Sequence, residues 1–432
     1  MRKHLNTTAI ILTAALLASA AARAGAAQGA QTSYTLPEYN AFQACQAEKD
    51  AQRRISCLDG FLNQYPNSTL RQYVFLLYYQ TYYQLKNYNR SLDNIDKLVA
   101  LGDKADLATR ISAIQNRVQV FALAYDAKAA DAHDQLTKSR DASLLGLKLL
   151  PELKKANAAV TDDQLKAVAL ALQTSLGTVN MQLKDSAAAV DAFKAVLAMN
   201  PSDALTSYRL GLAYLQASPP QSLDGFWALA RAINLKVQDS DKVKDYLRKS
   251  ILNYEQPNCD TLVDAQLSEL LQLAANSQER PASYSIPAAA DLQKIAQEST
   301  VVTMLADLQG GGDKAKMTWL ALCGLEFPGV GGKIIDVNSA ADSVTFHVFT
   351  SGNQDEMQNA TTANMEVKVV GQPEAARLAK DDPITFQGTV ASYDAQPFLL
   401  HWDKAKVDPS VIPEEKEGKR VPRKAPAKKT GA

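Results

Sequence analysis

Reactive side chains are scarce in this chain. It has only four histidines and four cysteines, and neither type occurs at the spacing of a zinc site. No serine lies in a G-x-S-x-G turn, and no cysteine has a histidine close by in the sequence. The sequence therefore predicts neither a nucleophilic active site nor a metal or other cofactor, and we expect that the protein is not an enzyme.

A net charge of either sign is also absent. Lys and Arg together number 46, as do Asp and Glu, so no overall charge steers the whole chain toward nucleic acid or membrane. From Lys419 onward, however, the chain holds six basic residues and no acidic ones. We expect residues 408–432 to form a disordered basic tail, which either contacts anionic membrane or cell-wall polymer or is simply solvated.

The N-terminal apolar run is too short to span a membrane. It extends from Ala9 to Ala22, whereas a spanning helix needs roughly 18 apolar residues. Two basic residues precede it, and Ala22-Arg23-Ala24 forms a small-x-small site. This pattern predicts a cleaved signal peptide over residues 1–24 rather than an anchor. No cysteine lies near the cleavage site, so we do not expect lipid attachment. We expect a periplasmic or secreted protein, in which disulfides can form.

The most informative feature is a pattern that recurs every 34 residues. The recurring pairs are Leu176/Leu210, Gly177/Gly211, Ala189/Leu223, Phe193/Trp227 and Val196/Ala230. A small residue lets two antiparallel helices approach closely, and a large apolar residue fills the groove to the next pair. Residues 170–236 thereby resemble the tetratricopeptide repeat family. The resemblance implies a solenoid of stacked helix pairs that binds proteins or peptides.

The same register can be followed upstream to two cysteines. It places Cys45 at the small position of a first helix and Cys57 at the small position of a second helix. On one straight helix, sulfurs twelve residues apart would lie about 18 Å apart and could not bond. In a helical hairpin that turns near residues 49–52 they face each other, so we predict a Cys45–Cys57 disulfide. The pairing of Cys259 and Cys323 stays open.

A tyrosine-rich first helix follows, with six aromatic residues in eleven positions between Tyr73 and Tyr83. They cover more than one helical face, so they either form an aromatic binding surface or are buried by helices on both sides. On the first helices of the repeats we predict six partner-binding residues. These are Tyr73, Gln80, Tyr83, Met181, Tyr208 and Leu212.

Between residues 106 and 163 the period blurs into long helices, and Pro151 predicts a kink or break. Helical patterns continue from Trp227 to residue 322, with a loop expected at Gly310–Gly312. The solenoid is expected over 37–280, followed by a helical connector over 281–328.

From residue 329 to 407 the pattern alternates with a period of two. Strand-like runs lie at 333–338, 343–349, 365–370, 384–395 and 397–407, with a helical stretch at 373–380. This order is that of a small Greek-key barrel. The segments "GKIIDV" and "DDPITFQGTVASYDAQPFLLHWDKAKV" resemble the OB-fold module, called tRNA-anticodon-like, of exported bacterial proteins. The resemblance implies a five-stranded OB-like barrel.

The expected barrel is a poor candidate for nucleic-acid binding. Residues 330–407 contain six Lys and Arg against ten Asp and Glu, and phosphate binding requires the opposite balance. His347 and His401 lie in strand-like runs and could approach each other, whereas His133 lies in a helical segment. Exposed or hydrogen-bonded structural histidines are the simpler interpretation.

The sequence thus predicts a mainly α, multidomain protein, with a tetratricopeptide-like solenoid followed by an OB-like barrel. We expect a non-enzymatic envelope scaffold that binds a protein or peptide partner and no nucleic acid. The alternative is a carbohydrate-binding envelope protein or an enzyme with a site in the tyrosine-rich groove. The identity of the partner and the oligomeric state are left open.

Overall fold

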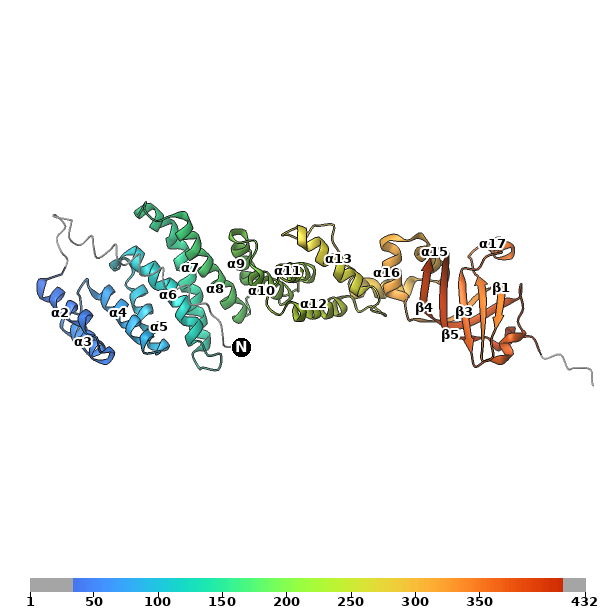
Figure 1. Ribbon diagram of the computed structural model, residues 1–432, viewed down its shortest axis with the longest axis horizontal. Helices are drawn as coiled ribbons and strands as arrows, with labels where there is room; N and C mark the ends of the chain where they lie inside the picture. The colour runs from blue at the N-terminus through green and yellow to red at the C-terminus, as the bar shows by residue number, and fades with distance from the viewer. Residues whose placement is uncertain (1–33, 415–432) are drawn as a thin grey trace, which may run out of the picture. The chain divides into compact units, whose positions relative to one another are not determined.

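The computed structural model describes residues 34–414, so the expected signal peptide and most of the basic tail lie outside the described residues. The described chain forms two units. The first unit comprises the chain up to Lys244 together with Ala274–Arg280, and the second comprises Asp245–Leu273 and the chain from Pro281 onward. The first unit is helical, whereas the second combines helices with a closed five-stranded barrel (Figure 1).

The first unit is a series of helices in which each packs against the next in the chain (Figure 1). Its helices are α2 (Leu36–Ala47), α3 (Ala51–Gln64), α4 (Arg71–Gln84), α5 (Tyr88–Ala100), α6 (Leu107–Ala124), α7 (Ala132–Ala156), α8 (Asp162–Gln182), α9 (Ser186–Met199), α10 (Ala204–Leu215) and α11 (Ser222–Asn234). Consecutive packed pairs joined by short turns are the geometry of a helical-repeat solenoid. The expected tetratricopeptide-like fold class is confirmed.

Two of these helix pairs, α4–α5 and α8–α9, are joined by the same kind of turn. Each turn consists of a lysine followed by a capping residue. Lys86 and Lys184 adopt φ of 58° and 63°, which ends α4 and α8. The following Asn87 and Asp185 donate their N–H groups to carbonyls five residues back, at 2.9 Å in both cases. Their side chains then accept from the second helix, at Arg90 N and Ala188 N. The same residue types therefore end one helix and start the next.

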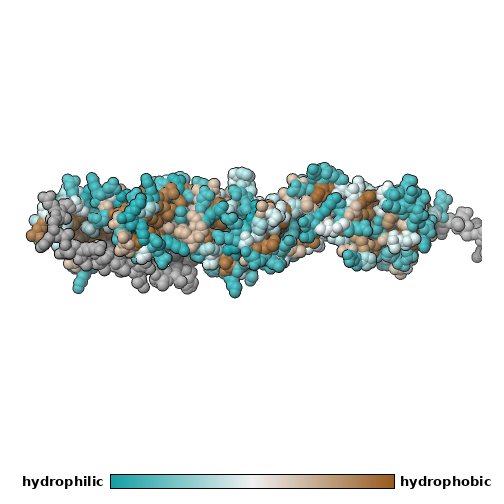
Figure 2. All heavy atoms as spheres, turned by 90° about the horizontal axis from the view of Figure 1, so that it is seen from above, coloured by the Kyte–Doolittle hydropathy of each residue, from teal (hydrophilic) through white to brown (hydrophobic). Residues whose placement is uncertain are grey.

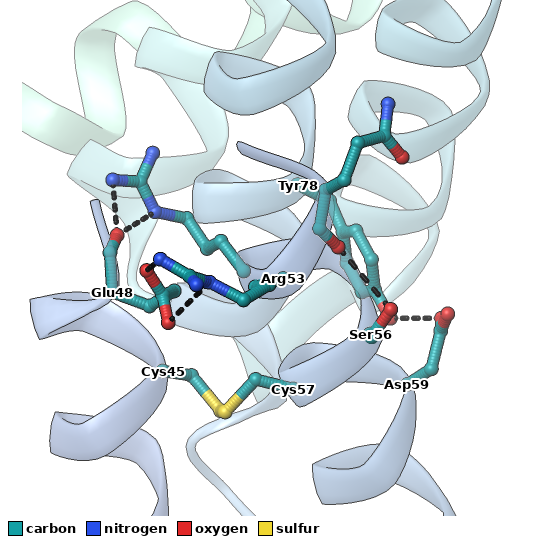
Figure 3. The surroundings of a disulfide bond; sticks show 9 residues. Cys45, Glu48, Arg53, Ser56, Cys57, Asp59 and Tyr78 are labelled. Carbon is teal, nitrogen blue, oxygen red and sulfur yellow. Dashed lines mark hydrogen bonds and ion pairs between the residues drawn. A yellow bond between two sulfur atoms is a disulfide. The ribbon is translucent and has the colours of Figure 1, made fainter. Parts of the chain in front are cut away.

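The Cys45–Cys57 disulfide is present and joins α2 to α3 across their turn, with Cα atoms 5.3 Å apart (Figure 3). Cys45 is 1% exposed and packs within the N-terminal core. Beside the disulfide, Glu48 pairs with Arg53 at 3.3 Å. The predicted helical hairpin thus places the two thiols face to face.

The expected break at Pro151 is absent, because α7 continues through it to Ala156. Proline removes one helical hydrogen bond and costs about 3 kcal/mol in a helix interior. The neighbouring Leu149 and Leu150 are both buried against α6 and α8 residues such as Ile114 and Leu172. Packing on two sides of the helix outweighs the local preference.

The second unit begins within α12 (Ser240–Glu255) and includes most of α13 (Val263–Asn276). It continues with α14 (Ala289–Glu298), α15 (Val301–Gly310) and α16 (Gly312–Leu322). The expected loop at Gly310–Gly312 is only a tight turn between α15 and α16, in which Gly311 and Gly312 have φ of 71° and 69°. Cys259 and Cys323 form a second disulfide, which ties the segment after α12 to the end of α16.

The barrel contains β1 (Glu326–Ser339), β2 (Ser343–Phe349), β3 (Met365–Val370), β4 (Pro383–Ala395) and β5 (Phe398–Val407). Its strand order is β1-β2-β3-β5-β4, closed by pairing of β1 with β4. All pairs are antiparallel except β3 with β5. The expected helical stretch after β3 is a 3₁₀ turn at Pro373–Arg377, and a short helix, α17 (Gln354–Asn359), lies between β2 and β3.

Alternating side chains of the strands fill the barrel. Trp402 is 1% exposed and makes edge-to-face contacts with Phe327 and Phe386. The buried faces of α14, α15 and α16 belong to the same core, in which Trp319 lies 5.0 Å from the ring of Tyr393. The helices expected to be a connector therefore share one hydrophobic core with the barrel.

Candidate partner-binding surface

The six predicted partner-binding residues all lie on first helices of the solenoid pairs. Tyr73, Gln80 and Tyr83 belong to α4, Met181 to α8, and Tyr208 and Leu212 to α10. None of the six is buried, and Tyr83 is 37% exposed. The visible face of the molecule is largely hydrophilic, with hydrophobic side chains in small separate patches (Figure 2). Tyr83 is thus exposed, and the other five residues are half-buried in the first unit.

They fall into two groups. The α4 residue Tyr73 packs against the N-terminal core, which α2 to α6 build together with Leu136 of α7 and Val179 of α8. Met181 packs against a separate cluster that includes Leu210 and Ala213 of α10, the helix that carries Tyr208 and Leu212. The structure therefore brings Met181 together with the α10 side chains, whereas the α4 residues form a second group.

Most tyrosines of helix α4 pack and hydrogen-bond within the solenoid and do not form an exposed aromatic surface. Tyr78 and Tyr79 are 4% and 6% exposed. Three hydroxyls tie α4 to its neighbours: Tyr73 donates to Asp106 at 3.1 Å, Tyr78 donates to Asp59 on α3 (Figure 3), and Tyr79 accepts from Asn116 on α6 at 3.2 Å. Burial raises the pKa of Tyr73 and of Tyr79 to about 12. These phenols are therefore neutral hydrogen-bonding groups, and the exposed side chains of α4 are those of Tyr83 and Gln84, with Gln80 half-buried.

A cavity lies elsewhere in the first unit, in what we call the α9–α11 groove. It has a volume of about 570 Å³ and is walled by α9, α10, α11 and residues 278–280. Leu197, Leu210 and Trp227 provide apolar wall, and Tyr214, Asp224 and Arg231 provide polar groups. The volume falls within the range of roughly 300–1,000 Å³ that is typical of ligand sites, and the lining also includes the polar side chains of Lys194, Gln221 and Glu279. The sequence analysis did not identify this groove, because a segment distant in sequence forms one of its walls.

Two charged residues of α11 dominate the polar chemistry of the α9–α11 groove. Arg231 donates to the main-chain carbonyls of Ser277 and Pro201, at 2.7 and 3.2 Å. Burial lowers the pKa of Arg231, and no ion pair is found for it among the residues that the structure describes. Asp224 pairs with Arg280 at 2.8 Å. Burial first, and then the charges of Asp224 and Glu279, raise the pKa of the nearby Tyr214 phenol.

A cluster of titratable side chains also lies on the barrel surface. His401 on β5 contacts Glu366 on β3 at 2.9 Å through Nδ1 and Asp394 on β4 at 3.0 Å through Nε2. His347 on β2 lies 3.5 Å from the same Glu366. The two barrel histidines thus approach each other through a shared carboxylate. Within residues 34–414 no group of three or more His, Cys, Asp or Glu side chains is arranged to hold a metal ion.

A helix that crosses a membrane must be both long and apolar. In the part of the chain that the structure describes, no helix combines enough length with enough apolar character to cross a bilayer.

No known protein family matches this sequence, and no curated protein matches it. Similar solved structures exist. A thermophilic tetratricopeptide repeat protein of Thermus thermophilus is 17% identical, with 50% of this chain and 99% of that chain covered and a TM-score of 0.24. The C-terminal part of a repeat-containing protein from Cytophaga hutchinsonii is 14% identical, with 56% and 96% covered and a TM-score of 0.24.

A third similar structure is the TPR2AB domain of yeast Sti1 in complex with pHSP90. It is 14% identical, with 55% of this chain and 95% of that chain covered and a TM-score of 0.18. These TM-scores are low. The assignment of the first unit as a tetratricopeptide-like solenoid therefore rests on its own helix pairs and on the close approach of Gly177 to Phe193 and of Gly211 to Leu229. The observed architecture is therefore a helical-repeat unit joined to a unit with a closed five-stranded barrel.

Proposed function

We propose that the protein is a non-enzymatic scaffold of the bacterial cell envelope whose solenoid binds a protein or peptide partner. The observation that carries this proposal is the solvent exposure of side chains on the first helices of the repeats. Tyr83 is exposed and Gln80, Tyr208 and Leu212 are half-buried on α4 and α10, whereas the core-facing side chains of both helices are buried. Rigid helices that present aromatic, amide and aliphatic groups without a reactive cluster suit recognition of another chain.

The barrel is proposed as a second contact surface, of OB-like type by its strand order and Greek-key connections. Of its aromatic residues, Phe346, Phe386 and Trp402 are at most 1% exposed and are not available to stack on bases, whereas Tyr393 and Phe398 are half-buried and pack against the barrel core. Together with the acidic balance of residues 330–407, this supports a protein contact rather than a nucleic-acid contact. The exported location and the role of the basic tail belong to the same proposal, because both depend on segments outside the described residues.

The test is capture of a partner from an envelope extract by the full chain. Wild-type protein should recover a stoichiometric protein partner, and Leu212→Ala combined with Tyr208→Ala should reduce recovery at least tenfold, because central contacts carry most binding energy. Leu144→Ala is the matched control. Leu144 is 49% exposed but lies on α7, a second helix, so its truncation should leave recovery unchanged.

Two results would count against the scaffold. One is equal recovery by the α10 double variant and by Leu144→Ala. The other is saturable binding or turnover of a glycan by the purified chain with no protein partner, which would favour the carbohydrate-handling alternative.

A further inference from the structure

The chain itself supplies a short non-helical segment, bent at Gln278 and Glu279, to the α9–α11 groove. Residues 277–280, with the sequence Ser-Gln-Glu-Arg, follow α13 in a non-helical conformation. They pack onto α9 and α11 within the first unit, and residues 278–280 form one wall of the groove. Helices α9, α10 and α11 lie side by side in the repeat order (Figure 1). The contacts of this segment therefore show what the groove can recognise.

Arg231 recognises the main chain of the segment. Its Nη1 donates to Ser277 O at 2.7 Å and to Ala274 O at 3.5 Å. A guanidinium that binds carbonyl oxygens reads the backbone and not the side chains. This contact would accept any peptide that presents a carbonyl at the same place.

Two further contacts read side chains. Asp224, in the first turn of α11, pairs with Arg280 Nε at 2.8 Å. The Gln278 amide donates to Leu197 O at 3.4 Å, and Leu197 belongs to the last turn of α9, where carbonyls lack helical partners. Asp224 and Arg231 are seven residues apart and share one face of α11. The groove therefore selects an arginine next to a captured carbonyl.

The segment does not fill the groove. About 570 Å³ remains beside residues 278–280, bounded by Leu210, Trp227 and Ala228. Trp227 is only 2% exposed, so it forms a fixed apolar wall. A peptide with the same polar contacts and an additional large apolar side chain would bury surface that the segment of the chain leaves open.

We propose that the α9–α11 groove binds a short non-helical peptide segment that carries an arginine for Asp224 and a large apolar side chain for the free volume, with residues 277–280 as a built-in competitor. This inference rests on the proposed scaffold function, but it places a specific ligand class at a surface separate from Tyr208 and Leu212. A ligand must displace the segment, so its affinity is reduced by the fraction of time in which the groove is closed.

The experiment measures fluorescence anisotropy of two labelled peptides with the full chain. One peptide copies residues 276–282, and the other carries Glu279→Phe in the same sequence. The Arg280→Ala protein lacks the ion pair that holds the competitor, so it should bind both peptides about tenfold more tightly than wild type if the segment occupies the groove about nine-tenths of the time. The Phe peptide should bind more tightly than the copy.

Two controls test the recognition itself. Asp224→Asn in the Arg280→Ala background should weaken both peptides at least tenfold, and replacing the arginine of either peptide with alanine should do the same without any change to the protein. Equal affinity of wild type and Arg280→Ala, an undiminished affinity after Asp224→Asn, or indifference to the peptide arginine would each overturn the proposal. Circular dichroism verifies that the protein variants are folded.

Leu212→Ala separates this inference from the proposed function. Leu212 does not line the α9–α11 groove, so this variant should bind the Phe peptide with wild-type affinity. If no envelope partner is captured but the peptides behave as expected, the scaffold proposal fails and the groove stands. If the partner is captured through α10 but the peptides do not bind to Arg280→Ala, the groove proposal fails alone.

Discussion

Gly177 on α8 lies against the ring of Phe193 on α9. A Cβ at Gly177 would stand 2.4 Å from the ring Cε1, and a Cβ at Gly211 would stand 2.7 Å from Leu229 Cγ and 3.0 Å from Gly225 O. Carbon atoms do not approach that closely in folded proteins. The 34-residue recurrence of glycine is therefore a recurrence of close helix contact.

Gly177→Ala should destabilise the α8–α9 pair by about 1–3 kcal/mol, since overpacking outweighs the gain of up to about 1 kcal/mol in helix propensity. Hydrogen exchange of α8 and α9 amides measures the local effect. Gly60 is the matched control, because it is helical and exposed with nothing within 4 Å of an added Cβ. Gly60→Ala should stabilise α3 slightly. Equal protection in the two variants would show that the close approach is not required.

The Cys45–Cys57 disulfide closes a short loop, with a sequence separation of 12 residues. In the chain-entropy view, a loop of this size stabilises the folded state by about 3 kcal/mol. Cys45→Ser/Cys57→Ser should lower the free energy of unfolding of the first unit by roughly this amount. Mass spectrometry of the non-reduced wild-type protein should show the two peptides joined, and free thiols at both positions would contradict the hairpin register.

Glu255, at the end of α12, is 0% exposed and accepts from Gln266 Nε2 at 2.8 Å. Burial raises its pKa to about 7. Because the folded state then holds a proton that the unfolded state releases near pH 4.5, the free energy of unfolding should fall as the pH rises from 4.5 through 7. The loss is up to about 3 kcal/mol at 1.4 kcal/mol per pKa unit.

Glu255→Gln should remove this slope, because the amide stays neutral and can also donate to Gln266 Oε1, which is buried without a partner. Urea unfolding at pH 5 and pH 8 measures the change in the second unit. Glu269→Gln, at an exposed position of α13, is the control and should keep the wild-type slope. A slope that survives Glu255→Gln would assign it to another group.

His401 should produce a pH dependence in the barrel. Burial opposes its charged form, but the hydrogen bonds and charges of Asp394 and Glu366 prevail and raise the pKa of His401 above its usual value. A raised pKa in the folded state means that this stabilisation is present below the ordinary histidine pKa and is lost as the pH rises through the raised one. An NMR titration of the His401 ring measures the shift.

Asp394→Asn and Glu366→Gln should each lower the pKa of His401, because each removes one carboxylate from a ring nitrogen. His347 lies 3.5 Å from Glu366, so Glu366→Gln also removes the carboxylate beside that second histidine. Asp394→Asn is therefore the more specific variant. If Asp394→Asn leaves the titration of His401 unchanged, the ion pair on β4 does not form in solution.

Much of the fold could be predicted because local patterns carry it. The alternation of apolar residues located all five strands, and the recurring Leu-Gly pairs located the α8–α9 and α10–α11 pairs. Of the kink or break expected at Pro151, the break does not occur, since proline has a local preference for ending a helix that the packing of Leu149 and Leu150 overrides.

The candidate site was less accessible to sequence reasoning. The first-helix positions follow from the repeat register, but the tyrosines between Tyr73 and Tyr83 could not be divided into binding and structural residues. Their partners, Asp106 and Asn116, lie 33 and 37 residues away from Tyr73 and Tyr79. Such contacts have no periodic signal.

The sequence by itself determined the helix pairs, the Cys45–Cys57 hairpin and the strands of the barrel, because hydrophobic period, caps and turn residues act over a few positions. Only the tertiary structure decided that Cys259 joins Cys323, that Glu255 is buried, and that residues 277–280 return to α11. The Arg231–Ser277 contact spans 46 residues. Contacts of that range depend on how whole elements pack, which no local pattern records.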